Sequence, residues 1–162
     1  MRRHEARIVV PTLEQMEALA GKIGASDLEE LAASHGMQPF VGIYLSVRQS
    51  REAWAGIVDG ALVGIFGVGL ADHGPDVGVP WLVPAEDLKQ HAGALLTCSR
   101  QFVERWRREY ALLQNHVHVG NARSIRWLRW LGFTIDPPRP WGVRGALFHR
   151  FWMRGDGDVF RN

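Results

Sequence analysis

The chain has 162 residues, 46% of them hydrophobic and 22% charged, a composition typical of one globular domain that excludes a disordered chain. Its single cysteine, Cys98, excludes an internal disulfide, and no apolar run is long enough to span a bilayer, so we expect a cytoplasmic protein. Up to Ser99 there are 7 Lys and Arg against 12 Asp and Glu, whereas the remainder has 12 against 5. The C-terminal part therefore suits a phosphate-bearing ligand or an acidic partner, or it is a solvated basic surface.

The N-terminal part of the chain is predicted to form one strand and three helices. They are a β-branched strand at 6–10 and amphipathic helices at 11–23, 26–36 and 40–50. In the second helix we expect Ser26 as the N-cap, Glu29 as its capping-box partner and Gly36 as the stop. The third segment is ambiguous between strand and helix, and a helix is favoured because its apolar residues fall on one face.

A β-hairpin is the clearest element of the sequence. Two apolar runs within 52–69 flank Asp59 and Gly60, a pair that tolerates the positive φ angles of a type I′ turn. A further strand follows at 76–83. Pro80 lies inside it, which predicts a bulge or a break in pairing at that residue.

The C-terminal half is predicted to contain a long helix, a short strand, a second helix and a strand–loop–strand unit. Their ranges are 93–113, 114–120, 124–132 and 133–154, followed by a polar, Gly-rich tail at 155–162 that we expect to be flexible. Residues 1–154 therefore form one domain. The order of elements is typical of an α/β fold whose mixed, mostly antiparallel sheet carries helices on both faces.

The segment "NARSIRWLRWLGF", from Asn121 to Phe133, carries the most information. A helix that turns by about 100° per residue places four apolar residues toward the sheet and four others away from it: Ile125, Trp127, Leu128 and Leu131, against Arg123, Arg126, Arg129 and Trp130. Asn121 lies at the N-cap, where its side chain satisfies helix amides, and Gly132 supplies a left-handed stop.

This segment and the order of elements resemble the GNAT (GCN5-related N-acetyltransferase) superfamily, over roughly residues 7–153. The matching positions are Asn121, Ser124, Ile125, Trp127, Leu131, Gly132 and Phe133. The resemblance implies transfer of an acetyl group from acetyl-CoA to an amine. It also implies a cofactor site in which a strand end pairs with the pantetheine arm, a loop and helix start take the pyrophosphate, and the motif helix adds contacts. These residues are Trp81, Leu82 and Val83, then Gln90 and Gly93, then Asn121 and Ser124.

Two positions depart from the family pattern. Leu128 stands where many members carry a tyrosine that protonates the departing thiolate, and a leucine has no proton to give. In the expected phosphate loop Leu95 replaces a small residue, and Glu86 and Asp87 add negative charge nearby. The whole chain looks most like the GNAT-like proteins of tailed bacteriophages, which include small internal virion proteins. A catalytically inactive structural or assembly protein therefore stays open as the second function.

The remaining candidate residues leave the catalytic groups open. His116 and His118 alternate on one strand, but no carboxylate or thiol is near in sequence, so no metal site is expected. Either histidine, or Glu52 or Asp72, could serve as a general base. Cys98 falls in a helical apolar pattern and is expected to be a buried side chain. The expected partners are acetyl-CoA and an amine, or other virion proteins, with room for a homodimer; nucleic acid and membrane are not expected.

Overall fold

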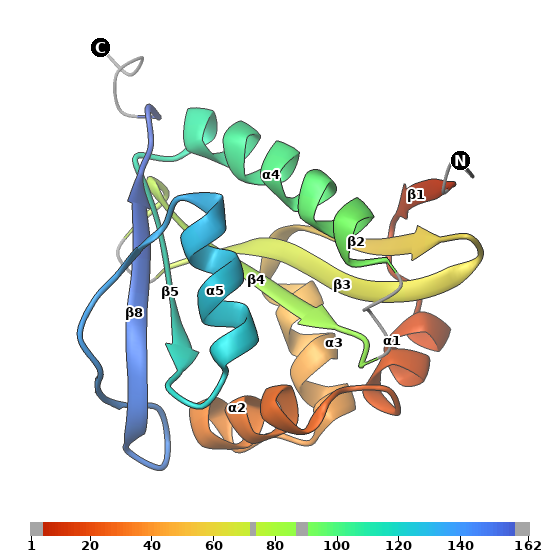
Figure 1. Cartoon of the computed structure of the whole chain (residues 1–162), viewed down its shortest axis with the longest axis horizontal. Helices are drawn as coiled ribbons and strands as arrows, with labels where there is room; N and C mark the ends of the chain where they lie inside the picture. Colours follow the sequence, from red (N-terminus) through yellow and green to blue (C-terminus); the bar gives the residue numbers. More distant parts are fainter. Residues whose placement is uncertain (1–4, 72–73, 87–90, 158–162) are drawn as a thin grey trace.

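The computed structural model describes residues 5–71, 74–86 and 91–157, which form one sheet flanked by helices (Figure 1). The strands are β1 (Ala6–Val9), β2 (Ser50–Val58), β3 (Ala61–Leu70), β4 (Val77–Pro84), β5 (Leu112–His118), β6 (Thr134–Ile135), β7 (Arg139–Trp141) and β8 (Ala146–Arg154). The helices are α1 (Leu13–Ala20), α2 (Ala25–His35), α3 (Pro39–Gln49), α4 (Ala92–Glu109) and α5 (Ala122–Leu131).

The described strands form an eight-stranded sheet in the order β1-β2-β3-β4-β5-β8-β6, with β7 paired to β8. Neighbouring strands are antiparallel except for β4 and β5, which are parallel. The helix α4 connects these two parallel strands. The predicted mixed, mostly antiparallel α/β fold is confirmed.

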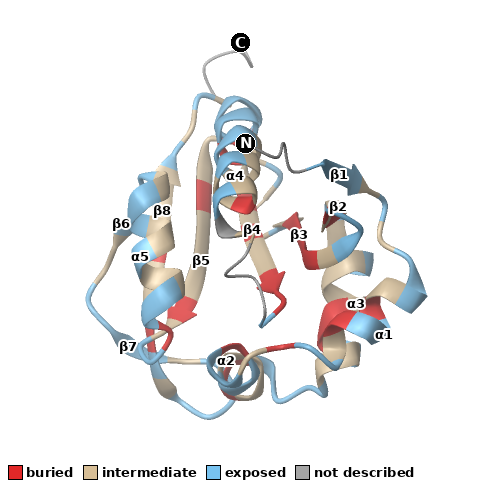
Figure 2. Ribbon diagram, turned by 45° about the vertical axis from the view of Figure 1, so that its right-hand side comes forward, coloured by how far each residue is buried: buried red, intermediate tan, exposed pale blue. Residues whose placement is uncertain are grey.

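Alternate residues of the central strands face opposite helical layers, as the two-residue period of a strand requires. Ile65 and Val83 pack with residues of α1 and α3 on one face. Phe66 and Leu82 pack with residues of α4 and α5 on the other. The buried positions of the central strands are visible in Figure 2. The two faces of the sheet therefore have separate cores, and a smaller third cluster of Val58, Val63 and Leu95 lies on the α4 and α5 face.

The β2–β3 hairpin has the predicted turn. Asp59 and Gly60 have φ angles of 49° and 80°, the two positive values of a type I′ turn. Asp59 also exchanges hydrogen bonds with Glu5 at the start of β1: the Glu5 amide donates to Asp59 Oδ1 and the Asp59 amide donates to the Glu5 carbonyl, both at 2.9 Å. The turn thereby fixes the edge strand as well as its own hairpin.

All five predicted helices are present, but not every predicted cap is correct. The ambiguous segment is a helix, α3, as favoured, and Gly36 ends α2 with a φ of 68°. The N-cap of α2, however, is Gly24 without a side-chain hydrogen bond, so the prediction of Ser26 as the cap was wrong. The capping box is in α1 instead, where Thr12 and Gln15 each accept the other's amide hydrogen.

The chain after β8 returns to the end of α4. The amides of Gly155, Asp156 and Gly157 donate to carbonyls of residues 111, 107 and 110, at 2.7, 2.6 and 3.1 Å. These three residues are the described part of the segment expected as a tail; residues 158–162 lie outside the described residues. None of the described helices is long and apolar enough to cross a lipid bilayer.

Candidate functional site

The parallel strands β4 and β5 pair only near their amino ends. Val77 lies opposite Leu112 and Gly78 opposite Leu113, and the described residues form no further pair between these strands. In a parallel ladder, alternate residues direct their amides toward the same neighbour, so the next donor after Gly78 would be Pro80. Proline has no amide hydrogen. The ladder stops there, and the strands diverge toward their carboxyl ends (Figure 1). The predicted break in pairing at Pro80 is therefore present between β4 and β5, whereas the pairing of Pro80 with Val68 of β3 continues.

The β4 edge of this gap carries few hydrogen-bond donors. The Ala85 amide donates to the Val63 carbonyl at 3.0 Å, so the odd-numbered residues of β4 direct their amides to β3 and the even-numbered residues direct theirs to the gap. The even positions that follow the β5 pairing are Pro80, Leu82 and Pro84. Two of these have no amide hydrogen. Within the described part of β4, Leu82 is therefore the position that can offer an amide to a ligand in the gap.

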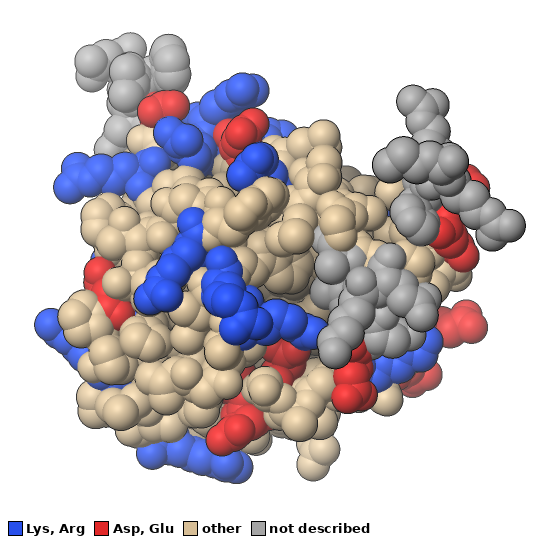
Figure 3. All heavy atoms as spheres, in the orientation of Figure 1, with Lys and Arg blue, Asp and Glu red and all other residues tan. Residues whose placement is uncertain are grey.

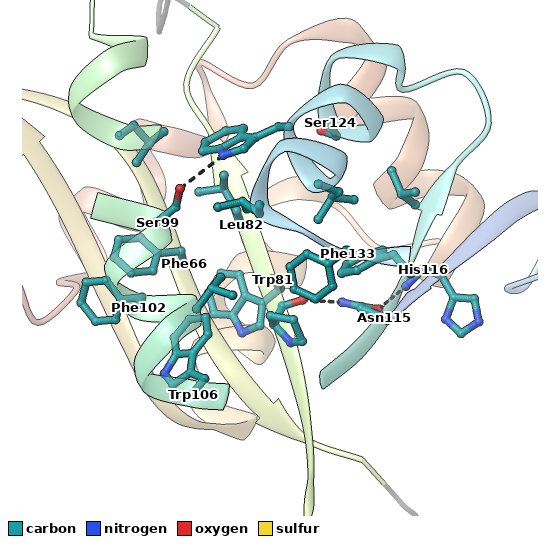
Figure 4. Close-up of a pocket in the computed structure, with 18 of the residues that line it drawn as sticks. Phe66, Trp81, Leu82, Ser99, Phe102, Trp106, Asn115, His116, Ser124 and Phe133 are labelled. Atoms are coloured by element: carbon teal, nitrogen blue, oxygen red, sulfur yellow. Dashed lines mark hydrogen bonds between the residues drawn. The ribbon is translucent and has the colours of Figure 1, made fainter. Parts of the chain in front are cut away.

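The β5 edge is occupied by side chains. Asn115 Nδ2 donates across the gap to the Pro80 carbonyl at 2.9 Å, and Asn115 Oδ1 accepts from the His116 amide at 2.8 Å (Figure 4). Farther along, Glu30 Oε1 accepts from the His118 amide at 2.7 Å. A ligand in the gap would therefore find its backbone partners on β4 and not on β5.

A cavity of about 160 Å³ occupies the gap on the side of α4 and α5 (Figure 4). Most of its walls are aromatic or aliphatic and include Phe66, Phe102, Trp106, Leu128, Phe133 and Phe151. Polar groups reach it from Ser99, Asn115, His116, Ser124 and Glu30. Apolar walls with a small number of polar groups are typical of a site for a small molecule.

Two contacts join α4 to α5 beside this cavity. Trp127 Nε1 donates to Ser99 Oγ at 3.2 Å, and the Arg100 guanidinium lies 3.9 Å from the centre of the Trp130 ring. Trp127 and Ser99 both line the cavity, so the first contact forms part of its wall. Trp130 is exposed and Trp127 faces inward, which confirms the two helix faces predicted from the sequence.

The three predicted strand residues do not share one orientation. Leu82 lines the cavity from the face of α4 and α5, whereas Trp81 packs in the same core as Val83 and also contributes to the cavity lining. Val83 is buried with residues of α1 and α3 on the other face of the sheet, and its amide is directed toward β3. Trp81 is further fixed by its indole, which donates to Ser50 Oγ at 2.7 Å.

Of the residues expected near a pyrophosphate, Gln90 lies outside the described residues. Gly93 is in the first turn of α4 and is exposed, with no atom within 4 Å of the position that a Cβ would take. His91, the N-cap residue, makes no side-chain capping hydrogen bond within the described part of the chain. Ser124, the other predicted contact, is in the first turn of α5 and lines the cavity.

Asn121 is the N-cap of α5, as predicted, but it is also committed to other contacts. Its side chain is buried at 2% exposure, and its Oδ1 accepts from the Ser124 amide at 3.4 Å. Its Nδ2 donates to Asp27 Oδ1 at 2.9 Å and approaches Glu30 Oε2 at 3.5 Å. The amide group therefore binds α2 to α5 within the protein and is not directed at the cavity.

Asp27 and Glu30 form an acidic pair that the sequence reasoning missed. Burial raises the pKa of Glu30 to about 7, and the charge of Asp27 adds to this, against hydrogen bonds from the His118 amide and Asn121 that lower it. Burial also raises the pKa of Asp27, against the Asn121 hydrogen bond and Arg123, whose guanidinium lies 3.5 Å from Asp27 Oδ2. Their three-residue spacing on one helix face was the available signal.

The other candidate bases have different surroundings. His116 lines the cavity, and its ring stacks on Trp141 with centroids 4.2 Å apart. Burial lowers the pKa of His116, and the charge of Arg150 acts in the same direction. Glu52 accepts hydrogen bonds from the Trp106 indole and from Arg105, so its carboxylate is used to fix these two side chains of α4. Asp72 lies outside the described residues. The described side chains include no group of three or more His, Cys, Asp and Glu placed to hold a metal ion.

The fold is that of the GNAT acetyltransferases. No protein-family model matches the chain, and no curated protein matches it in sequence. Among solved structures, the aminoglycoside acetyltransferase AAC(6')-Ib in complex with coenzyme A has 14% identity and a TM-score of 0.68, over 98% of this chain and 100% of that one. Spermidine N-acetyltransferase from Vibrio cholerae, in complex with CoA and spermine, has 9% identity and a TM-score of 0.68, over 95% of this chain and 98% of that one. RimL, a ribosomal L7/L12 alpha-N-protein acetyltransferase in complex with coenzyme A, has 12% identity and a TM-score of 0.66, over 94% of this chain and 96% of that one.

Proposed function

We propose that this protein transfers an acetyl group from acetyl-CoA to an amine. The observation that carries the proposal is the gap between β4 and β5, which opens at Pro80 and holds a mostly apolar cavity with a few polar groups. The three acetyltransferases named above share the fold, and each was solved with coenzyme A. A thin, flexible arm such as pantetheine suits this narrow space.

The chain has groups that fit both ends of acetyl-CoA. The Leu82 amide is placed to donate to a carbonyl of the pantetheine arm. Among the described residues, His91 at the N-cap of α4 makes no side-chain capping hydrogen bond, and the amides at a helix start favour a phosphate. Three exposed arginines on α5 add positive charge on the same side of the molecule: Arg123, Arg126 and Arg129. Figure 3 shows basic side chains gathered over this face.

Two features of the site constrain the reaction. Leu128 lies in the cavity wall, so this position supplies no proton to the departing thiolate. The bridge from Trp127 to Ser99 joins the two helices beside the cavity. If acetyl-CoA enters between α4 and α5, the indole has to move aside.

Binding is tested by calorimetry and thermal unfolding with acetyl-CoA. A ligand at 100 times its dissociation constant stabilises a protein by about 2.7 kcal/mol, which raises the unfolding midpoint of a chain of this size by about 5–11 °C. Transfer is then measured as release of the CoA thiol with a panel of amines that includes spermine, an aminoglycoside and a peptide with a free N-terminus. No shift with millimolar acetyl-CoA would overturn the proposal.

A pair of variants at Leu82 tests the backbone contact directly. Leu82→Pro removes the amide that faces the gap and no amide of the β3 ladder, because the even-numbered residues of β4 direct their amides away from β3. Leu82→Ala removes the same side-chain packing but keeps the amide. We expect Leu82→Pro to bind acetyl-CoA at least tenfold more weakly than Leu82→Ala, with both variants folded. Equal affinities would exclude the role of this amide.

The second candidate function is a structural or assembly protein without catalysis, of the kind that tailed phages carry on this scaffold. Three observations favour it: the Asn115 bridge across the gap, the Trp127–Ser99 bridge between the helices, and the leucine at position 128. This function predicts that acetyl-CoA neither binds nor stabilises the protein.

A further inference from the structure

Glu30 brings a carboxylate to the cavity from the opposite side to α4. Among the described residues that line the cavity, it is the one with a carboxylate. It lies on α2, which packs at the carboxyl end of β5, where Glu30 Oε1 accepts the His118 amide hydrogen at 2.7 Å. This hydrogen bond fixes the position of the carboxylate and still leaves lone pairs on both oxygens.

The titratable and charged groups nearest to Glu30 come from three elements. Asp27 shares its helix, His116 and His118 belong to β5, and Arg123 comes from the start of α5. Arg123 lies against Asp27 and not against Glu30. In the contacts of the described residues, Glu30 therefore has hydrogen-bond donors but no paired cation, and a desolvated carboxylate without a cation holds a proton more tightly.

We propose that Glu30 is the general base of the transfer, and that the acceptor is a primary amine that reaches the cavity from the side of α2. This inference rests on the acetyltransferase function proposed above. An amine is an ammonium ion at neutral pH, and a carboxylate at the cavity end attracts it. The acceptor and acetyl-CoA then meet from opposite sides, with the thioester between β4 and β5.

The chemical step balances with Glu30 as the proton acceptor. The bound ammonium ion first gives one proton to the Glu30 carboxylate. The neutral amine nitrogen then attacks the thioester carbonyl carbon, the C–N bond forms and the C–S bond breaks, and the electron pair of that bond leaves on sulfur. The second proton on nitrogen is lost to solvent. The products are the amide, the CoA thiolate and a protonated Glu30, which returns its proton to solvent while the thiolate takes one from solvent.

The pKa of Glu30, raised to about 7 by burial, suits this role, since a general base works best when its pKa lies near the operating pH. His116 is the competing base in the same cavity. Its ring is held against Trp141, and burial lowers its pKa, so it is neutral at pH 7 and also able to accept a proton. The two residues are distinguished by substitution.

The test compares Glu30→Gln with Glu29→Gln, a matched change at the neighbouring exposed carboxylate of the same helix. Glutamine keeps an oxygen that accepts the His118 amide, so the fold is retained. We expect kcat/KM for the amine to fall by about 10²–10⁴-fold in Glu30→Gln, with loss of the rise in rate near pH 7. Acetyl-CoA affinity by calorimetry and all properties of Glu29→Gln should match the wild type.

Each outcome separates this inference from the proposed function. A wild-type chain that binds no acetyl-CoA overturns both. If the wild type acetylates amines and Glu30→Gln has the same rate and pH profile, the role of Glu30 alone is overturned. If His116→Asn instead loses the rise in rate near pH 7, His116 is the general base. If Glu30→Gln fails to fold, Glu30→Asp replaces it: a shortened carboxylate should lower kcat at least tenfold and retain the pH limb, whereas full activity would refute the inference.

Discussion

The ionisation of Glu30 predicts how the stability of the folded chain depends on pH. Its pKa rises from an ordinary value of 4.5 to about 7 on folding. Between these two pH values the folded chain holds a proton that the unfolded chain has lost, so stability falls as pH rises through this window. The stabilisation is complete below pH 4.5 and is lost above pH 7.

The size of this effect follows from the two pKa values. Each pH unit across the window removes about 1.36 kcal/mol, so the total is at most about 3 kcal/mol for a side chain that keeps some solvent contact. Glu30→Gln removes the ionisation and keeps an acceptor for the His118 amide. At pH 8.5 this variant should unfold about 6–12 °C higher than the wild type, and at pH 4.5 the two should nearly coincide.

The assay is denaturant or thermal unfolding at a series of pH values from 4 to 9. Glu29→Gln, an exposed change on the same helix, should follow the wild-type curve throughout. Asp27 also has a raised pKa, and its charge raises the pKa of Glu30, so the difference between the wild type and Glu30→Gln includes the interaction between the two carboxylates. Parallel curves for the wild type and Glu30→Gln over the whole range would refute the burial argument for this carboxylate.

Three further predictions concern packing and access. Trp127→Phe removes the indole hydrogen bond to Ser99, so the free energy of unfolding should fall by about 0.5–1.5 kcal/mol. Association with acetyl-CoA, measured by stopped flow, should become faster. Slower association would contradict the idea that this hydrogen bond lies across the entry path between α4 and α5. Gly67→Ala places a Cβ 2.4 Å from a backbone carbonyl of β2 and should lose about 1–3 kcal/mol in unfolding experiments, whereas Gly93→Ala meets no atom within 4 Å and should lose nothing. Burial raises the pKa of the Cys98 thiol, so iodoacetamide should label the folded chain much more slowly than the unfolded one at pH 8; equal rates would disprove its burial.

Local signals in the sequence were sufficient for most of the fold. The turn at Asp59 and Gly60 needs two residues that accept positive φ, and few pairs do so. The motif helix was predicted with both faces because its apolar and basic residues repeat at helical spacing. The cap of α2 was predicted wrongly, because Ser26 and Glu29 form a capping box only if the helix starts at that serine, and it starts earlier at Ala25.

The candidate site was less accessible to sequence reasoning, because its properties depend on contacts between distant residues. The position of Pro80 was noted, but its effect on β5 requires the sheet order. Asn121 is predicted as a helix cap from the sequence, and only the structure shows that its amide nitrogen donates to Asp27, 94 residues away, and to Glu30. Glu30 is one of several acidic residues on α2, and its environment is set by β5.

A sheet that opens in its middle has two strand edges into which a strand of another molecule could insert. An inserted strand needs alternating hydrogen-bond donors and acceptors on both of the strand edges that flank it. Here β4 offers Leu82 between two prolines, and the β5 amides of His116 and His118 already have partners. The opening can thus receive a slender molecule that needs one or two hydrogen bonds, but it cannot join two chains into a continuous sheet.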